Sequence, residues 1–550
     1  MIRSCQPMLL VRSDPSPLHQ AMLTSAEIGR ITAFQRERLS IDIDKMLAGY
    51  QDSTSWPEPS MTMMNKSPDL VDTFQQEYID ILPSDWNVLS VSLNAQRTEF
   101  VITKIRRDRT PFMLRLPLKR ANEGDEEEEE EEFTFDAGKA EMMEIIKLAN
   151  ASAHDAKTRV DRKSKKEWWA TREALDRRLE TLLCNMENIW LGGFRGIFSA
   201  IPADPTKLAR FAASFACILD KHLPSRRKSR GKGDKIRLNE HVLELFVGLR
   251  DLDKEENPED AIMDLLYFVV DILQFHGERN AYDEIDFDMM VVETLDALNA
   301  YHESVREDDQ RPCHTILVLD KALHSFPWES LPCLQGCPVS RVPSLECLRE
   351  RIARFRSTGC AYSNKFHISR SAGSYILNPS GDLKSTQNAF ETDLAKAGPG
   401  WPSIVNRNPN EDEFKTLLED RSLMLYFGHG SGAQYIRGRT IKRLDRCAVT
   451  FLMGCSSGSL TEAGELEPFG PPVNYMHAGS PALVATLWDV TDKDIDRFAR
   501  GTLERWGLFE GTEMGTAALD EAVAGSRSAC VLRYLNGAAP VIYGIPVYLD

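Results

Sequence analysis

Two glycine-framed motifs contain the residues best suited to chemistry. The first, YFGHG at residues 426–430, contains His429, and the second, FLMGCSSG at residues 451–458, contains Cys455. Each is an apolar run that ends abruptly in small residues, which indicates a buried strand delivering one reactive side chain to the carboxyl edge of a sheet. A thiol is a strong nucleophile only as its thiolate, so it needs a neighbouring base or positive charge, and an imidazole can serve. The pair therefore predicts the nucleophile and base of a cysteine protease.

Glycines surround both residues and allow the backbone to approach a substrate closely. They are Gly428, Gly430 and Gly432 near the histidine, and Gly454 and Gly458 near the cysteine. We predict that the amides of Gly430 and Cys455 donate to the oxyanion of a tetrahedral intermediate. The alternative interpretation is a structural cysteine and a core histidine. This alternative would be favoured for a single cysteine or histidine. It is disfavoured here because two glycine-framed residues follow successive strands.

A second alternative is a serine hydrolase. Residues 454–458 match the pattern G-x-S-x-G, with Ser456 as the nucleophile. That fold requires an acid and then a histidine downstream, and the only downstream histidine is His477, with Glu462, Glu465 and Glu467 as the acids between. About 20 residues leave too little chain for the intervening strands and helices, so chain order disfavours this interpretation.

An acidic segment follows the third apolar run. Its four carboxylates within eight residues are Asp489, Asp492, Asp494 and Asp496. Such residues can cap a helix and interact favourably with its dipole. Next to a catalytic cleft, they would also receive a guanidinium group through bidentate hydrogen bonds. The segment therefore predicts cleavage after arginine.

The composition is ordinary for a globular protein, and we expect neither a bound metal nor a cofactor. The chain has 550 residues, 42% of them hydrophobic and 27% charged, and a net charge of −17, which disfavours nucleic-acid binding. No apolar stretch approaches the length of a membrane span, so we expect a soluble intracellular protein. Eleven scattered cysteines suit reduced thiols, and the pair Cys333 and Cys337 lacks the second pair that a zinc finger requires.

Periodicity divides the chain into five parts. We predict a helical and irregular segment (1–85), a β-meander of the protease domain (86–120), an acidic loop (121–136), a helical-bundle insertion (137–305) and a catalytic domain (306–550). In the last part, short apolar runs alternate with helical patterns, which predicts an α/β fold with a mostly parallel sheet flanked by helices. The expected strands there are Thr315–Leu319, Ser374–Leu377, Leu423–Phe427, Ala448–Met453 and Leu483–Trp488.

Two charged segments fall between these elements. Seven consecutive glutamates at 126–132 cannot be buried together and predict a solvated loop. A basic run at 225–232 interrupts the helices and is either a linker, which we favour, or a nuclear-import signal.

The motifs resemble those of the C-terminal protease domain of separase. The resemblance covers LYFGHGSG at 425–432, MGCSSG at 453–458 and VATLWDVTDKDIDR at 484–497. The segment LVLDKALHSFPWESLP at 317–332 is also similar to the strand and turn that precede the active half in separase and in the related CHAT proteases.

The resemblance implies a caspase-like fold and a Cys-His endopeptidase that cleaves the kleisin subunit of cohesin after the arginine of Glu-x-x-Arg. It gives Cys455 the role of nucleophile and His429 that of general acid and base. Asp496 and Asp494 are the first candidates for binding the arginine, and Lys493 and Arg497 for binding the glutamate. Securin is the expected inhibitor, bound as a pseudosubstrate, and the expected location is the cytoplasm and nucleus, with chromosomes and spindle at anaphase.

Separases are usually much longer, so we expect this chain to be a fragment of such a protein. A catalytically silent scaffold that binds a securin-like partner is the alternative from another functional class.

Overall fold

The structure is a computed structural model. It describes residues 17–49, 74–107, 109–119, 133–155, 161–228, 235–250, 252, 257–305, 312–357, 365–509 and 517–550. The predicted glutamate loop and part of the predicted basic run lie outside the described residues. No helix in these ranges is both long and apolar enough to cross a membrane.

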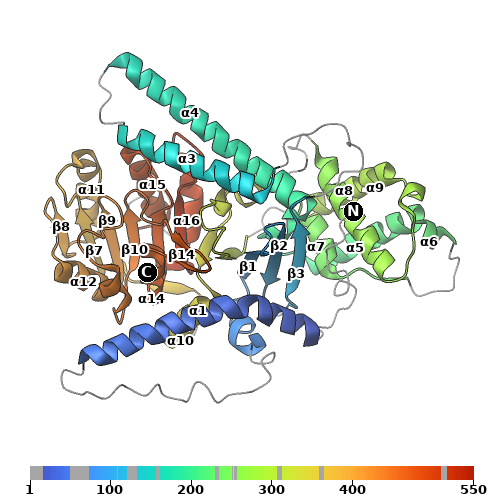
Figure 1. The fold of residues 1–550 in the computed structure, drawn as a ribbon, viewed down its shortest axis with the longest axis horizontal. Coiled ribbons are helices and arrows are strands. Elements are labelled where there is room, and N and C mark those ends of the chain that lie inside the picture. The colour runs from blue at the N-terminus through green and yellow to red at the C-terminus, as the bar shows by residue number, and fades with distance from the viewer. Residues whose placement is uncertain are drawn as a thin grey trace.

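One eleven-stranded sheet runs through the molecule (Figure 1). Its strand order is β3-β2-β1-β4-β5-β14-β13-β10-β9-β7-β8. The strands are β1 (Trp86–Leu93), β2 (Glu99–Ile105), β3 (Phe112–Pro117), β4 (His314–Leu319), β5 (Val339–Val342), β7 (Gly373–Leu377), β8 (Ser403–Val405), β9 (Leu423–Phe427), β10 (Val449–Met453), β13 (Ala482–Thr486) and β14 (Pro540–Gly544). Two-stranded pairs form from β6 (Phe366–Ile368) with β15 (Val547–Leu549) and from β11 (Thr461–Ala463) with β12 (Leu466–Phe469).

Most neighbouring strands of the large sheet are parallel, which confirms the predicted α/β fold class. The exceptions are the β1–β2–β3 meander and the β13–β14 pair. Since β13 and β14 are antiparallel, the sheet changes direction between them. On one side of this seam, β13, β10, β9, β7 and β8 all point the same way, so their carboxyl ends lie along one edge.

Helices cover both faces of the sheet (Figure 1). On one side lie α15 (Asp492–Arg505), α16 (Leu519–Ser526) and a long hairpin of α3 (Phe135–Asp155) and α4 (Arg162–Asn185). On the other side lie α1 (Pro17–Gly49), α10 (Leu345–Ser357) and α14 (Pro471–His477). The helices α11 (Lys384–Ala397), α12 (Glu411–Glu419) and α13 (Gly438–Lys442) connect the strands near β7 to β10.

The helical insertion is not one bundle, as the sequence had suggested, but two separate parts. The α3–α4 hairpin extends over the half that contains β9 and β10, whereas the other helices gather beyond β3 (Figure 1). These are α5 (Pro205–His222), α6 (Pro224–Lys228), α7 (Glu240–Val247), α8 (Pro258–Phe275) and α9 (Phe287–Ser304). Periodicity along the chain marks an apolar face but does not say which surface it covers, so it could not separate the two parts.

A tight 3₁₀ turn joins the two parts. Residues Gly192–Phe198 pack so closely on α7 and α8 that a Cβ at Gly193 would lie 2.0 Å from the carbonyl oxygen of Ala261. A Cβ at Gly196 would lie equally close to the carbonyl oxygen of Leu245. Only glycine permits this backbone contact.

Candidate active site

The register of two neighbouring parallel strands brings the loops that contain His429 and Cys455 to the same edge of the sheet. In the β9–β10 pair, Phe427 lies opposite Met453. His429 is the second residue after Phe427, and Cys455 is the second residue after Met453. Because the strands are parallel and in register, the two side chains leave the same edge of the sheet at equivalent positions.

The loops that follow the two strands touch through their backbones. A Cβ at Gly454 would lie 2.2 Å from the carbonyl oxygen of Gly430 and 2.4 Å from that of Gly428. Gly430 itself has φ of +58°, a left-handed conformation that suits glycine. The buried hydroxyl of Tyr426 donates to the carbonyl oxygen of His429 at 2.8 Å. These contacts fix the histidine loop against the cysteine loop.

A carboxylate orients the imidazole. His429 Nε2 lies 2.8 Å from Asp382 Oδ2, and the two side chains are 44% and 49% exposed. When Nε2 donates this bond, Nδ1 is the nitrogen left to exchange a proton. No hydrogen bond joins the imidazole and the thiol, both of which lie in the described part of the chain.

Sequence reasoning missed Asp382. It follows β7, the strand next to β9, and lies in the turn NPSGD at 378–382. A polar residue just after a third strand was the available signal, since ligands and catalytic groups gather at the carboxyl ends of parallel strands.

The Cys455 thiol is protonated in the structure's resting arrangement. Burial, the negative charge of Asp489 and, less strongly, that of Asp492 raise its pKa to about 11. Sγ contacts the carbonyl oxygen of Val490 at 3.5 Å, within the range of a weak sulfur hydrogen bond. The resting thiol is therefore not the thiolate that the motif had suggested.

The neighbouring Ser456 does not have the surroundings of a serine nucleophile. Its Oγ donates to Asp489 Oδ1 at 2.5 Å, and its φ is +53°. The histidine that this alternative would need, His477, stacks on Phe34 of α1 with ring centroids 4.4 Å apart. Burial lowers the pKa of His477 to about 3. The Ser456 hydroxyl is thus bound to a carboxylate and has no imidazole beside it to act as its base. This arrangement disfavours the serine hydrolase.

Two carboxylates of the acidic segment point inward. Asp494 is 2% exposed, and its oxygens accept hydrogen bonds from Arg497 Nη1 and Asn536 Nδ2, each at 2.6 Å. Asp489 is also buried and holds the Ser456 hydroxyl. Both residues therefore stabilise the loop between β13 and α15.

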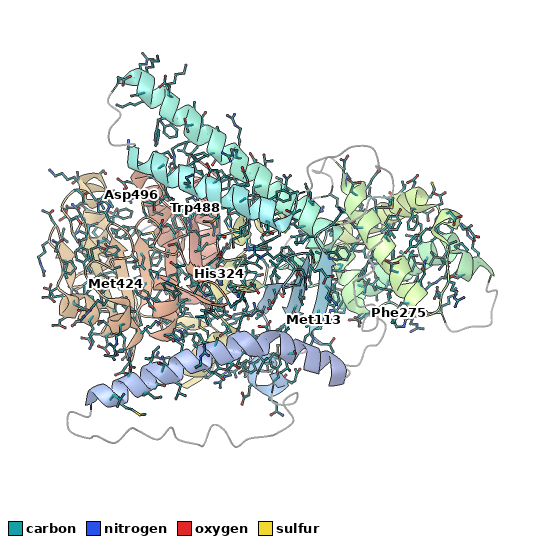
Figure 2. All side chains as sticks on the ribbon, viewed as in Figure 1. Met113, Phe275, His324, Met424, Trp488 and Asp496 are labelled. Carbon is teal, nitrogen blue, oxygen red and sulfur yellow. The ribbon has the colours of Figure 1, made fainter. Side chains whose placement is uncertain are left out.

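Asp496 has a different environment. It lies on the side of the sheet covered by the α3–α4 hairpin, as does Trp488, whereas Phe275 lies at the far end of the molecule (Figure 2). Its Oδ2 accepts a hydrogen bond from Thr386 Oγ1 at 2.9 Å. Burial raises the pKa of Asp496 to about 7, and nearby Asp492 adds to the shift. This carboxylate lacks enough compensation for its negative charge, so a cation bound beside it would stabilise the charged form.

The other three predicted binding residues also belong to the start of α15. Asp492 is half-buried at the first position of the helix, and Lys493 is exposed. Arg497 is 49% exposed and pairs with Asp494.

The α3–α4 hairpin supports this loop from behind. Asn150 Oδ1 accepts a hydrogen bond from the backbone N–H of Asp489 at 2.9 Å. Arg172 is completely buried and donates to Asn536 Oδ1 at 2.7 Å, while Asn536 in turn donates to Asp494. These residues come from helices whose sequence shows only an amphipathic pattern, so their role could not be read from the sequence.

The chain is similar to known proteins in both sequence and fold. A family model described as "Separin, protease domain" matches residues 95–495, which is more than half of the chain. The chain is 64% identical over 529 residues to a separin of Emericella nidulans, covering 94% of this chain and 25% of the relative. It is 46% identical over 481 residues to a separin of Schizosaccharomyces pombe, covering 87% of this chain and 26% of the relative.

The chain belongs to the separin (separase) family and contains its protease domain. The fold is similar to that of the separase in a crystal structure of the Saccharomyces cerevisiae separase–securin complex, with a TM-score of 0.80 and 33% identity. That match covers 93% of this chain and 33% of the other. The predicted family is thus confirmed, and this separase chain spans about a quarter of the length of the curated separins it matches.

The described part of the separase chain offers no cluster of three or more histidine, cysteine or acidic side chains that could hold a metal ion.

The raised thiol pKa makes a direct prediction for alkylation. In the resting protein, the rate of Cys455 alkylation by iodoacetamide should keep rising up to about pH 11, because the reactive thiolate forms only near the thiol pKa of about 11. Asp489→Asn should move this pH–rate curve to lower pH, and Asp492→Asn should move it less, because each removes a negative charge that disfavours the thiolate. Mass spectrometry of the labelled peptide measures the rate.

Asp412→Asn, an exposed carboxylate change on α12, is the control and should leave the curve unmoved. A rate that levels off near neutral pH would contradict the protonated resting thiol.

Proposed function

We propose that this chain is a cysteine endopeptidase in which Cys455 is the nucleophile and His429 is the general acid and base. The observation that carries the proposal is the β9–β10 register, which brings both residues to equivalent positions at one edge of the sheet. The family membership supports the same pair, since the motifs that resemble separase contain both residues.

The proposed reaction begins with proton transfer from the Cys455 thiol to His429 Nδ1. The sulfur then attacks the peptide carbonyl, and the amides of Gly430 and Cys455 donate to the oxygen that becomes negatively charged. His429 next gives its proton to the departing amine, which leaves an acyl-enzyme on the sulfur. Finally, His429 takes a proton from water, and the hydroxide attacks the thioester carbonyl. The C–S bond then breaks, the acid product leaves, and the Cys455 sulfur takes the proton back from His429.

Asp382 acts in this scheme as a positioning residue. Its hydrogen bond to Nε2 selects the tautomer with Nδ1 free to exchange protons and orients the ring. Its half-exposed position limits the size of that effect because water screens the interaction. Transfer from the thiol then occurs within the substrate complex, which agrees with a thiol that is protonated at rest.

Asp496 is the proposed partner of the substrate arginine. Asp496 is half-buried and has a raised pKa, whereas Asp489 and Asp494 hold the loop together. Asp492 lies close enough to raise the pKa of Asp496, so it would share the guanidinium. Lys493 and Arg497 remain the proposed partners for a glutamate three residues before the arginine.

We further propose that the substrate is a kleisin subunit of cohesin, cut at Glu-x-x-Arg to release sister chromatids, with the protein acting in the cytoplasm and nucleus and on chromosomes and spindle at anaphase. A securin-type inhibitor would occupy the same cleft as a pseudosubstrate. The solved complex of the related S. cerevisiae separase with securin supports such a partner.

The central test is cleavage of a peptide that contains Glu-x-x-Arg. The protein should cut after the arginine, and Cys455→Ser and His429→Ala should each lower kcat/KM by at least about 1000-fold, since each removes a group that takes part in bond making or proton transfer. Mass spectrometry of the products locates the cut. Ser456→Ala serves as the matched control and should retain cleavage. A catalytically silent scaffold would show no cleavage in any form, and a serine hydrolase would lose activity with Ser456.

The arginine site makes a separate prediction. Asp496→Asn should lower kcat/KM for the arginine peptide by about 10–100-fold, because hydrogen bonds to charged groups contribute about 1.5–3 kcal/mol. In the parent protein, KM should fall as the pH rises through about 7, since the carboxyl group loses its proton and gains attraction for the cation. Steady-state kinetics across pH measure both effects.

The same peptide with citrulline in place of arginine is the control, because it keeps the shape and removes the charge. Its cleavage should be slow and should hardly respond to Asp496→Asn. Equal loss on both peptides would assign Asp496 a structural role instead.

A further inference from the structure

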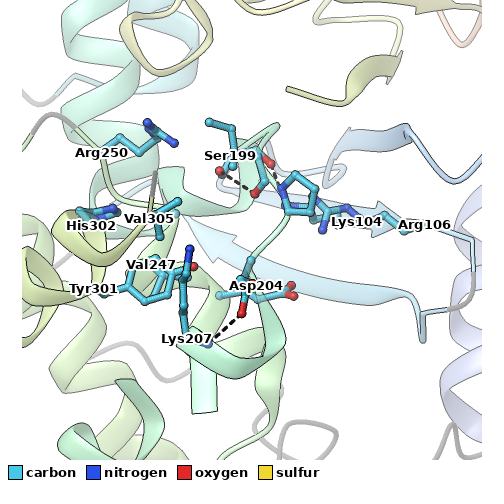
Figure 3. Close-up of a pocket in the computed structure, with 15 residues that line it drawn as sticks. Lys104, Arg106, Ser199, Asp204, Lys207, Val247, Arg250, Tyr301, His302 and Val305 are labelled. Carbon is cyan, nitrogen blue, oxygen red and sulfur yellow. Dashed lines mark hydrogen bonds between the residues drawn. The ribbon is translucent and has the colours of Figure 1, made fainter. Parts of the chain in front are cut away.

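A cavity of about 240 Å³ lies away from the candidate active site, where the β-meander meets the second part of the helical insertion (Figure 3). Its walls come from the end of β2, the segment before α5 and the ends of α7 and α9. None of these elements contributes a residue to the cysteine and histidine loops. The cavity is therefore a feature of the fold that proteolysis does not explain.

Positive charge exceeds negative charge around the cavity. Four basic residues line it, together with two acidic residues. The basic residues are Lys104, Arg106, Lys207 and Arg250, and the acidic residues are Asp204 and Glu244.

Both acidic residues interact with other groups of the protein. Asp204 caps α5 by accepting hydrogen bonds from the backbone N–H groups of Thr206 and Lys207, at 2.8 and 2.9 Å. Glu244 lies 3.5 Å from the ring of His241 and 3.8 Å from Arg109. The charge of Glu244 also acts on Lys104 and Arg106 and offsets part of their positive charge, but Arg106 Nε and Nη2 donate no hydrogen bond to either acid in the described residues.

Arg106 has guanidinium nitrogens without partners. Its Nε and Nη2 atoms are buried, and neither makes a hydrogen bond within the described part of the chain. A buried donor without an acceptor costs about 1–3 kcal/mol, and more when the group is charged. These two nitrogens form one edge of the guanidinium fork, the edge that binds both oxygens of a carboxylate or phosphate.

Lys104 lies beside this edge, and its burial, together with the charge of Arg106, lowers its pKa to about 7. Its ammonium group is buried and donates to the carbonyl oxygens of Ile197 and Ser199 at 2.8 and 3.2 Å. An ammonium group has three donors, so one N–H remains after these two bonds. A bound anion would meet that donor and would favour the charged form of Lys104 over its neutral amine.

We propose that this cavity binds an acidic peptide segment through a single oxyanion, either a carboxylate or a phosphorylated side chain, held by Arg106 with Lys104 and Lys207 beside it. The size favours a peptide over a free ion, because a water molecule occupies about 30 Å³ and the cavity holds several times that volume. Its walls also include apolar surface from Ile201, Pro202 and Val247, which suits the neighbours of the acidic residue. This inference is independent of the proposed proteolysis.

The test uses three fluorescein-labelled peptides, Gly-Val-X-Val-Gly, in which X is glutamate, phosphoserine or serine. Fluorescence anisotropy should show binding of the glutamate peptide, the phosphoserine peptide or both, and tighter binding than that of the serine peptide. Inorganic phosphate should compete. The peptide that binds more tightly identifies the natural oxyanion.

Arg106→Gln should weaken binding at least tenfold, and Lys207→Gln should weaken it less. Arg210→Gln removes the same charge from the exposed surface of α5, outside the cavity, and should leave binding unchanged. Without ligand, Arg106→Gln should not lower the melting temperature, since the buried Nε and Nη2 atoms of Arg106 make no hydrogen bond in the described part of the chain. Cleavage of short arginine peptides should also be retained.

Three results would overturn the proposal: no binding of either acidic peptide at millimolar concentration, equal binding of all three peptides, or equal affinity in the Arg106→Gln variant. A lower melting temperature for that variant without ligand would assign the guanidinium a structural role and would overturn it as well.

Discussion

The candidate active site depends on the in-register parallel pairing of β9 and β10. This pairing sets how far beyond the ends of the strands the loops with His429 and Cys455 begin. The close contact of Gly454 with the carbonyl oxygens of Gly428 and Gly430 fixes the distance between these loops. A shift of one residue in either strand would turn its side chains to the opposite face. The two strands are fully buried, so such a shift would also expose apolar residues.

The rest of the protein holds that edge in place. The α3–α4 hairpin reaches the loop after β13 through Asn150 and the wholly buried Arg172, which is linked to Asp494 by Asn536. Removing one member of a buried charged network costs about 3–5 kcal/mol. The hairpin therefore helps to hold the candidate active site together, although it lies far from Cys455 in the sequence.

The sequence was sufficient for the parts of the fold that follow from local patterns. The predicted strand Leu423–Phe427 agrees with β9 in full, and Ala448–Met453 differs from β10 by one residue, because each is an apolar run closed by glycine. The strand predicted to end at Trp488 ends at Thr486. Sequence reasoning did not find Asp382, because its relation to His429 exists only after β7 and β9 become neighbours.

The sequence also could not predict how the charges of the candidate site are compensated in the fold. Four similar carboxylates in one segment differ in the structure, because Asp489 and Asp494 accept several hydrogen bonds while the half-buried Asp496 has little compensation for its charge. The resting thiol is another example, since burial and two acids together determine its pKa. Both effects depend on residues brought together from distant parts of the chain.

The most direct measurement is a crystal structure of the protein after reaction with an arginine-based peptidyl acyloxymethyl ketone. The account predicts a thioether bond to the sulfur of Cys455, with the His429 imidazole next to the trapped carbonyl and the arginine side chain directed at Asp496. A bond to a different cysteine, or an imidazole on the opposite face of the sheet from the labelled sulfur, would contradict it.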